Sequence, residues 1–453
     1  MLFLLFFAVH AYAALYTNVS QLSQRTFDFV IVGAGGAGAV VANRLSEDPT
    51  FTVLLLEAGG SAAGLLNYSV PMFALYLRDP SPLNWNYTLA PQPGLDNRTI
   101  AHPRGKVLGG CTAHNGMVYQ RGSIDDYNRY AKVTGDQGWS WDAIQPYIQK
   151  VLLTVFLRSD QTRLQIEQWT SPTDNHNTTG QYDPSIHGYH GAVSISLSST
   201  PISITPMVLE AAKELGNAYR FNLDTNSGDE LGIGYPQFTI RHGNRDDSAT
   251  AYLSPPILSR PNLHVLLHAQ VTHLSSGPGG PFSTVEFGES EGTPRYQVMA
   301  TKEVVLSAGA IETPHIMLLS GIGDSDELTS YGITPKVNLP DVGKNLSVHV
   351  QLYTSYYFNS TQTYDDVFRN VTVRNALLEG WERTRGGGPL GGSYESLGVF
   401  LRLSTDGFLD PSAGPRSAHL TQAVENAMGA ENTPAIGNFI SIADQVVTPT
   451  SRK

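Results

Sequence analysis

The sequence predicts a two-domain α/β protein, and three observations support this fold class. Residues 27–57 combine two strand-like apolar runs with a glycine-rich turn and a helical pattern between them. Two more strand-like runs occur much later, within residues 263–310. The length of 453 residues is enough for about two or three domains. The first domain is therefore expected to be discontinuous, and the second is expected to be a sheet with helices on one face.

The first unit of the pattern can be followed along the chain. Residues 27–32 form an apolar run of strand length, and residues 39–47 place apolar side chains at helical spacing. Residues 52–57 then form a second strand of the buried type. A strand, a helix and a strand in this order indicate a parallel pair joined by a right-handed crossover.

The rest of the chain gives weaker signals. Residues 59–138 are dense in glycine, proline and asparagine and are expected to be mainly loop, and residues 160–190 are polar with few signs of order. The other expected elements are helices at 142–157 and 205–215, strands at 192–197, 263–274, 302–309, 352–358 and 399–403, and a hairpin within 283–299.

A glycine motif lies between the first strand and the helix. Gly33, Gly35 and Gly38 form G-x-G-x-x-G, which permits a tight turn, close approach of a pyrophosphate, and packing of the helix on the strand. Glu57 ends the next strand 19 residues after Gly38, near the usual position of a ribose-binding carboxylate. A carboxylate there would repel a 2′-phosphate, so NADP is disfavoured. The motif alone is compatible with FAD or NAD.

Composition excludes some classes of function. The 29 basic and 40 acidic side chains give a formal net charge of −11, which argues against a protein that binds nucleic acid. The apolar run at the N-terminus is too short to span a bilayer, and no later stretch reaches roughly 18 uninterrupted apolar residues, so no membrane association is expected. No metal site is predicted.

The N-terminus indicates a secreted protein. Residues 2–9 are apolar and residues 11–13 have the small-x-small form of a cleavage site, which predicts a signal peptide over residues 1–13; an N-terminal core element is the alternative. N-x-S/T sequons favour an extracellular glycoprotein, because glycans would solubilise a chain in which only 15% of residues are charged. The sequons begin at Asn18, Asn67, Asn86, Asn97, Asn177, Asn345, Asn359 and Asn370.

Longer blocks of sequence carry a family resemblance. The segment RGKVLGGCTAHNGMV from Arg104 resembles the first signature of the glucose–methanol–choline (GMC) family of flavin-dependent alcohol oxidoreductases. WNYTLAPQPG from Trp85, GAIETPHIMLLSGIG from Gly309 and LPDVGKNLSVH from Leu339 are similar to other stretches of that family. The match covers nearly all of the chain and is nearest the aryl-alcohol oxidase and pyranose dehydrogenase branch. The resemblance implies FAD, rather than NAD, as the cofactor.

The resemblance also implies a domain division. An FAD-binding domain of the Rossmann type would comprise residues 26–140 and 232–330. A substrate domain would comprise residues 141–231 and 331–453 and would cover the reactive side of the flavin.

Particular residues acquire roles from the resemblance. Glu57 would bind the adenosine ribose, and Val271 would contact the adenine. His114, in a G-C-x-x-H-N arrangement, would either carry a covalent bond to FAD or lie hydrogen-bonded near the flavin. Cys111, the only cysteine, would be a buried structural thiol rather than a nucleophile. The other residues implied to lie at the flavin are Val107, Gly109, Gly110, Asn115, Gly116, Met117 and Val118.

The implied activity is oxidation of the CH–OH group of an aryl alcohol or a sugar. A hydride would pass to flavin N5, and oxygen or a quinone would accept the electrons. In the family, a histidine base lies in a C-terminal segment of the H-P-x-G-T type. His315, His349 and His419 do not match that segment. No catalytic residue is therefore assigned, and the chain is expected to be a C-terminally truncated form.

Two alternative functions stay open. A non-catalytic, flavin-binding secreted glycoprotein, either a pseudoenzyme or a fragment, would keep the glycine cradle without the chemistry. An NAD-dependent dehydrogenase would also use the glycine motif, but the block GKVLGGCTAHN counts against it.

Overall fold

The computed structural model consists of two compact units. It describes residues 15–92, 96–149, 166–199, 204–216, 219–277, 279–290, 292–346, 364–400 and 440–443, so the expected signal peptide lies outside it. The first unit comprises the described residues of Met1–Ser69, Phe73–Asn115 and Asp246–Gln351, and the second comprises those of Val70–Met72, Gly116–Arg245 and Leu352–Lys453. Both units combine sheets with helices, which confirms the predicted α/β class.

A seven-stranded sheet organises the first unit. Its strands are β1 (Leu15–Tyr16), β2 (Thr26–Val32), β3 (Val53–Leu56), β13 (Leu263–Leu266), β14 (Gln270–Ser276), β15 (Phe282–Gly288) and β16 (Tyr296–Leu306). The order is β1-β13-β3-β2-β16-β15-β14, parallel from β1 to β16 and antiparallel from β16 to β14. The early and the late strands therefore share one sheet, as the sequence predicts.

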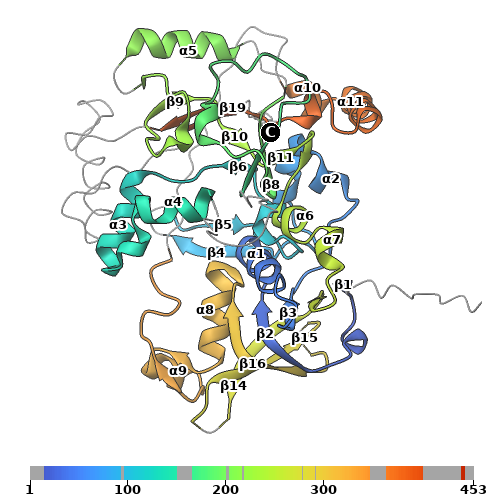
Figure 1. Cartoon of the computed structure of the whole chain (residues 1–453), viewed down its shortest axis with the longest axis vertical. Helices are drawn as coiled ribbons and strands as arrows, with labels where there is room; N and C mark the ends of the chain where they lie inside the picture. Colours follow the sequence, from blue (N-terminus) through green and yellow to red (C-terminus); the bar gives the residue numbers. More distant parts are fainter. Residues whose placement is uncertain are drawn as a thin grey trace, which may run out of the picture. The chain divides into compact units, whose positions relative to one another are not determined.

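Short helices and hairpins surround this sheet. The helices are α1 (Gly36–Leu45), α2 (Leu66–Ser69), α6 (Ser248–Tyr252), α7 (Pro255–Leu258), α8 (Gly309–Leu319) and α9 (Ser325–Ser330), with a 3-10 turn, η4, at Gly110–Ala113. The small strands are β4 (Tyr87–Gln92), β5 (Arg98–His102), β17 (Ile322–Gly323) and β18 (Val337–Asn338). α1 packs on β2 and β3, and α8 packs on β14 (Figure 1).

The core of the first unit follows the sheet. Every residue of β3 is buried, because a central parallel strand is covered on both faces. Val30 and Val32 of β2 are buried in the same cluster as Leu54. Ile316 of α8 joins this cluster and fixes the helix to the sheet.

The second unit contains smaller sheets and longer helices. Its strands are β6 (Val118–Tyr119), β7 (Glu167–Trp169), β8 (Val193–Leu197), β9 (Gly232–Gly234), β10 (Gln237–Phe238), β11 (Ile240–Arg241), β12 (Asn244–Arg245), β19 (Glu395–Phe400) and β20 (Ile440–Ala443). Its helices are α3 (Ile124–Thr134), α4 (Trp141–Gln149), α5 (Ile204–Leu215), α10 (Asp365–Arg369) and α11 (Val371–Thr384). Two sheets have the orders β6-β10-β8-β7 and β20-β19-β9.

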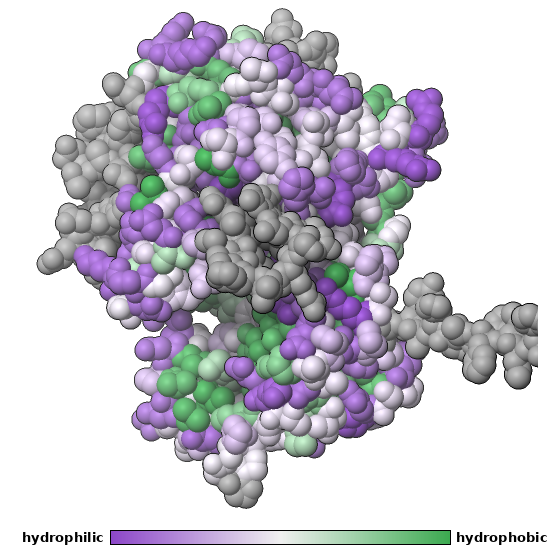
Figure 2. Space-filling view, in the orientation of Figure 1, coloured by the Kyte–Doolittle hydropathy of each residue, from purple (hydrophilic) through white to green (hydrophobic). Residues whose placement is uncertain are grey.

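Helix α5 is an amphipathic cover for one of these sheets. Ala212 of α5 is buried in a cluster with Ile233 of β9 and Leu397 of β19. Hydrophilic residues predominate on the visible surfaces of α5 and α11 (Figure 2). The apolar stripe of α5 therefore faces the sheet, as expected for a surface helix.

A cluster of charged side chains is buried in the second unit. His187 places Nδ1 3.0 Å from Glu167 Oε2 and Nε2 2.8 Å from Asp224 Oδ2. Arg121 donates to the same Glu167 carboxylate from Nε at 2.8 Å. Burial alone would lower the pKa of His187, but its hydrogen bonds to the two carboxylates outweigh that effect and raise the pKa. Burial would likewise raise the pKa of Glu167, but His187 and Arg121 lower it to about 2.

Several elements differ from expectation. The stretch 59–138, expected to be mainly loop, contains the β4–β5 hairpin and the whole of α3. α3 begins at a capping box, in which Ser123 Oγ accepts a hydrogen bond from the Asp126 N–H at 3.1 Å. The helix expected over 142–157 is α4, ending at Gln149 within the described residues. The expected strand at 352–358 lies outside them.

The unit boundaries also differ from the expected domain boundaries. Residues 116–140 and 232–245 belong to the second unit, because β6, β9 and β10 pair with strands of that unit. Residues 331–346 belong to the first unit, because β18 pairs with β17.

Candidate functional site

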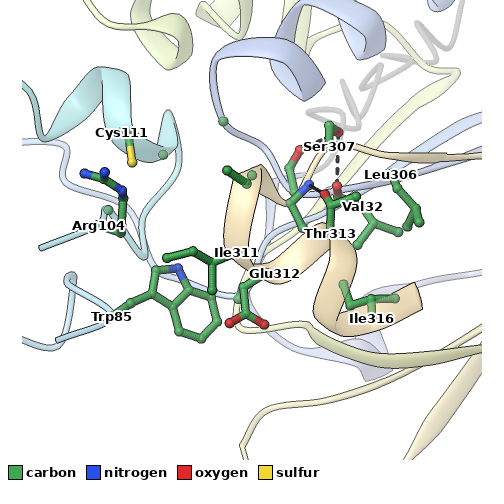
Figure 3. A pocket seen from close by; sticks show the side chains of 18 of the residues that line it. Val32, Trp85, Arg104, Cys111, Leu306, Ser307, Ile311, Glu312, Thr313 and Ile316 are labelled. Carbon is green, nitrogen blue, oxygen red and sulfur yellow. Dashed lines mark hydrogen bonds between the residues drawn. The ribbon is translucent and has the colours of Figure 1, made fainter. Parts of the chain in front are cut away.

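A cavity of the first unit lies at the carboxyl ends of its parallel strands. It has a volume of about 700 Å³ and is lined by residues of β2, β3, β14, α1, α8, η4 and the segment around β4 and β5 (Figure 3). Ligands of open parallel sheets bind in this position, so the cavity is the candidate site.

The glycine motif forms one wall of the cavity. A Cβ on Gly33, which has φ +93°, would lie 2.6 Å from the Ser307 carbonyl oxygen. A Cβ on Gly38 would lie 1.9 Å from the Gly33 carbonyl oxygen. Only glycine fits at these two positions, because a side chain would displace backbone. Gly35, the N-cap of α1, has no side-chain cap, so the first N–H groups of the helix are available to an anion.

A second backbone segment approaches the glycine motif. Gly110 has φ +53°, and a Cβ there would lie 2.7 Å from Gly35 Cα. The Gly109 N–H donates to the Ala34 carbonyl oxygen at 2.9 Å. The segment before η4 is therefore fixed against the turn between β2 and α1.

Glu57 places a buried carboxyl group at the end of β3. Its Oε2 accepts a hydrogen bond from the Ala34 N–H at 2.9 Å, and its Oε1 accepts one from the Gly59 N–H at 2.8 Å. Burial raises the pKa of Glu57 to about 7, although these hydrogen bonds oppose the shift. The group lines the cavity as a hydrogen-bond acceptor suited to hydroxyl groups.

Residues at the start of α8 complete the floor of the cavity. Ser307 Oγ donates to the carbonyl oxygens of Val32 at 3.0 Å and Gly33 at 3.1 Å (Figure 3). Thr313 Oγ1 accepts the Ala308 N–H at 3.0 Å. Neither hydroxyl group could be identified from the sequence, because the partners of Ser307 are more than two hundred residues away and the partner of Thr313 belongs to a local turn.

The outer wall holds polar and aromatic side chains. Tyr87 of β4 donates a hydrogen bond from its hydroxyl group to Glu312 of α8, and both residues line the cavity. The Trp85 and Tyr87 rings stack with centroids 5.7 Å apart. Lys106 Nζ lies 4.7 Å from the centroid of the Trp85 ring. Arg104, the first residue of the segment that resembles the first family signature, also lines the cavity.

The structure brings some of the predicted residues together in this cavity. Gly33, Gly35, Glu57, Gly110 and Val271 line it. Other predicted residues are not among those that line the cavity. A Cβ on Gly38 would meet the Gly33 carbonyl oxygen, and Val107 is fully buried. Gly109 donates its N–H to Ala34, and His114 is half-buried with its ring 6.4 Å from that of Tyr68. Asn115 ends a segment of the first unit, whereas Gly116, Met117 and Val118 belong to the second unit.

The remaining sequence candidates have the following positions. Cys111 lies on the cavity wall and is exposed, so the expectation of a buried thiol is wrong; η4 turns it toward the cavity rather than the core. His315 is on α8, with Nδ1 3.2 Å from Glu312 Oε2. His349 and His419 lie outside the described residues. Within the described part of the chain, no group of three metal-ligating side chains comes together.

The arrangement fits a dinucleotide cofactor. A glycine cradle at a helix N-terminus suits a pyrophosphate, and the carboxyl group of Glu57 suits a ribose. A Cβ is excluded at Gly33, which makes the tight turn, and at Gly38, where the helix packs on the strand, as the glycine motif of dinucleotide sites requires.

Comparison with known proteins adds to this geometry. The family model described as GMC oxidoreductase matches residues 27–351. The chain is 40% identical over 462 aligned positions to the dehydrogenase eriK of Hericium erinaceus, covering 99% of this chain and 74% of that protein. It is 40% identical to pyranose dehydrogenase 3 of Leucoagaricus meleagris, covering 87% of this chain and 62% of that protein. The chain thus spans less than two thirds of the pyranose dehydrogenase.

A solved structure has a similar fold. An FAD-dependent oxidoreductase from Chaetomium thermophilum superposes with a TM-score of 0.72 and 27% identity. The match covers 91% of this chain and 71% of that protein.

Proposed function

Because the chain belongs to the GMC oxidoreductase family, we propose that it acts as an FAD-dependent oxidoreductase on the CH–OH group of an aryl alcohol or a sugar. Membership of this family confirms FAD as the predicted cofactor. The sugar part of the proposal is supported by the 40% identity to a pyranose dehydrogenase.

One observation carries the proposal: the cavity at the end of the parallel sheet. The N-terminus of α1 and Gly35 would hold the pyrophosphate, since backbone N–H groups and the helix dipole favour an anion there. Glu57 would accept hydrogen bonds from the ribose hydroxyl groups. Val271 would contact the adenine, as the resemblance implies.

The flavin end involves the segment 107–118. Gly109 and Gly110 allow the backbone to pass close to a flat ring, because neither carries a Cβ. Asn115, Gly116, Met117 and Val118 would line the ring. When bound, FAD supplies a two-electron acceptor for a hydride from the donor carbon. Oxygen or a quinone would then accept the electrons.

His114 has two possible roles toward the flavin, a covalent bond or a hydrogen bond. Its side chain is half-buried beside Tyr68. Denaturing electrophoresis distinguishes the two roles, because a covalent flavin stays fluorescent on the protein band. The variant His114→Ala should lose that fluorescence while keeping dissociable FAD.

Secretion as a glycoprotein forms part of the proposal. Of the eight sequon asparagines, the seven described ones are all exposed, which glycan attachment requires. Among the described helices, none combines the length and the apolar character needed to cross a bilayer. Mass spectrometry before and after enzymatic deglycosylation of the secreted protein would test the attachment.

Turnover separates the proposed enzyme from a flavin-binding pseudoenzyme. The purified protein should show the visible absorbance of oxidised flavin, and anaerobic addition of a sugar or a benzylic alcohol should bleach it. A yellow protein that no donor bleaches would favour the pseudoenzyme. A colourless protein that takes up no added FAD would contradict both.

A further inference from the structure

The first described residues of the chain are tied to the edge of the large sheet. β1 pairs in parallel with β13, with Leu15 opposite Val265 and Tyr16 opposite Leu266. The Tyr16 carbonyl oxygen accepts a hydrogen bond from the Leu267 N–H at 2.9 Å, one residue beyond the end of β13. β1 is only two residues long, so contacts of its side chains and of the next residues must help to hold it.

Such contacts are present. The Tyr16 ring stacks on that of His264, with centroids 6.0 Å apart and an interplanar angle of 13°, and its hydroxyl oxygen lies 3.2 Å from His264 Nδ1. Burial lowers the pKa of His264, which favours the neutral ring that can accept this hydrogen bond. Val19 and Leu22 are buried in the core cluster of the large sheet. We call residues 15–22 the N-terminal clip.

Polar side chains close a turn within the N-terminal clip. Asn18 Oδ1 accepts a hydrogen bond from the Ser20 N–H at 2.8 Å. Gln21 Oε1 accepts the N–H groups of Thr17 and Asn18, each at 2.9 Å. This is a capping box, in which each side chain satisfies backbone donors at the start of the helical turn. The N-terminal clip is therefore an ordered segment with its own hydrogen bonds.

The turn that follows β13 is bonded on its other side to the loop of Glu57. The Leu266 carbonyl oxygen accepts the Glu57 N–H at 2.9 Å, and the Glu57 carbonyl oxygen accepts the Ala269 N–H at 2.8 Å. The His268 N–H donates to the Gly59 carbonyl oxygen at 3.1 Å. Glu57 and Ala269 both line the cavity. The turn thus links the N-terminal clip to a wall of the cofactor site.

This turn contains a strained residue. His268 has φ +55°, in the left-handed region that residues other than glycine seldom adopt. Such a conformation persists only where the surrounding contacts over-determine it. The neighbours Leu267 and Ala269 are buried, and their N–H groups are bonded to the N-terminal clip and to Glu57. The clip therefore supplies one of the bonds that keep the turn in its strained form.

We infer that the N-terminal clip positions the cofactor-binding carboxyl group: by holding the turn at residues 267–269, it keeps the Glu57 loop in the conformation that binds the ribose of FAD. The inference rests on the proposed FAD site. Without the clip the sheet would still be paired from β13 to β14, but the turn would be held from the side of β3 alone. No residue of the clip is among those that line the cavity, so its members are positioning residues.

The test compares three variants of the full chain. Tyr16→Pro removes the N–H group and the ring from the centre of β1. Tyr16→Ala keeps the backbone but removes the ring and the hydroxyl group. Ser276→Pro is the matched control, because it changes the last residue of β14, the strand at the opposite edge of the same sheet.

Two measurements are made in a His114→Ala background, which cannot form a covalent bond to FAD, and under conditions where circular dichroism shows every variant folded. Hydrogen exchange followed by mass spectrometry reports opening of residues 57–60 and 264–270 in protein freed of FAD. The fluorescence gained on dilution of the loaded protein reports release of FAD. Tyr16→Pro should speed both about tenfold, as expected for loss of backbone pairing and a ring contact. Tyr16→Ala should speed both about threefold, and Ser276→Pro should change neither.

The outcomes separate the N-terminal clip from the proposed function. A parent protein that holds no FAD would overturn the proposed function and this inference with it. A parent that holds FAD, with release unchanged in both Tyr16 variants, would overturn the inference alone, even if exchange were faster. Equal acceleration in Ser276→Pro would also overturn it, because the effect would then come from loosening of the whole sheet. If Tyr16→Pro does not fold, Tyr16→Ala decides the question by itself.

Discussion

In the interior of the second unit, His187 Nε2 lies 2.8 Å from Asp224 Oδ2. The other ring nitrogen faces Glu167, and a neutral imidazole has only one N–H group. Both contacts are hydrogen bonds when the ring carries a positive charge. The ring of Trp169 lies beside the imidazole, with centroids 4.7 Å apart. The cluster therefore links β7, the segment around residue 187 and the turn at Asp224 through one charged ring.

Replacing His187 by glutamine should destabilise the second unit. The substitution leaves two buried carboxylates with one cation, Arg121, and breaking a buried ion pair costs about 3–5 kcal/mol. Urea unfolding followed by tryptophan fluorescence would measure the loss. His176→Gln is the control, because the side chains of His176 and Asp174 keep 17% and 22% exposure. Equal losses in the two variants would contradict the role of the cluster.

The same cluster predicts how stability depends on pH. The pKa of Glu167 is lowered to about 2 and that of Asp224 is also lowered, so their contribution is present above about pH 4 and is lost as pH falls through the folded values. The pKa of His187 is raised, so its contribution is complete below about pH 6.5 and is lost as pH rises through the folded value. The cluster should therefore contribute most between about pH 4 and pH 6.5. The urea concentration at the unfolding midpoint, measured over a pH series, should decrease as pH rises above about 6.5 in the parent. It should decrease less in His187→Gln.

A methyl group at Gly38 should disrupt the cofactor site. The added Cβ would lie 1.9 Å from the Gly33 carbonyl oxygen, so the turn between β2 and α1 must move. We expect Gly38→Ala to lose about 1–3 kcal/mol of stability and most of its bound FAD. Gly380→Ala, in α11, meets nothing within 4 Å and should gain up to about 1 kcal/mol. Melting temperature and flavin content per protein would show both effects; retained flavin in Gly38→Ala would refute the expected disruption.

Glutamine at position 57 should weaken FAD binding. Both carboxylate oxygens of Glu57 accept backbone N–H groups, whereas a glutamine would turn its own N–H₂ toward one of them. A cost of about 1–3 kcal/mol corresponds to an increase of roughly fivefold to a hundredfold in the dissociation constant of FAD. Glu47→Gln, at an exposed pair with Arg44, should bind FAD like the parent. Titration of the refolded apoprotein with FAD, in the His114→Ala background, would measure both.

The pKa of Glu57 adds a dependence on pH to the first unit. It is raised to about 7 from 4.5, so the stability due to the protonated group is complete below 4.5 and is lost as pH rises to about 7. Glu57→Gln cannot titrate and should lack this decline. The comparison requires unfolding curves of the two proteins at about pH 5 and pH 8; parallel declines would exclude Glu57 as the cause.

The parts of the fold that depend on local pattern could be predicted from the sequence. The run of apolar residues in β3 and the glycines before α1 identified the sheet and the cradle, because burial and backbone conformation at these sites admit few residue types. α3 was missed, although the spacing of Ser123 and Asp126 is a capping-box signal.

Other parts of the site depend on contacts between distant residues. Ser307 reaches Val32, and Tyr87 reaches Glu312, but nothing in the neighbouring sequence of either residue indicates its partner. The short strand β6 was placed in the wrong unit for the same reason, since its partner β10 lies more than one hundred residues later. Such pairings need the three-dimensional structure.

The order of strands in the large sheet has a consequence for synthesis of the protein. β3 pairs with β13, and the turn at Gly33 contacts Ser307. The N-terminal strands therefore lack these partners until residue 307 has been synthesised. At about 5–20 residues per second, the ribosome needs more than about ten seconds to extend the chain from residue 57 to residue 307. During that interval β3 lacks its partner β13 and β2 lacks its partner β16, and the whole second-unit segment 116–245 emerges before the sheet can close. Cofactor capture is therefore a late event in the life of the nascent chain.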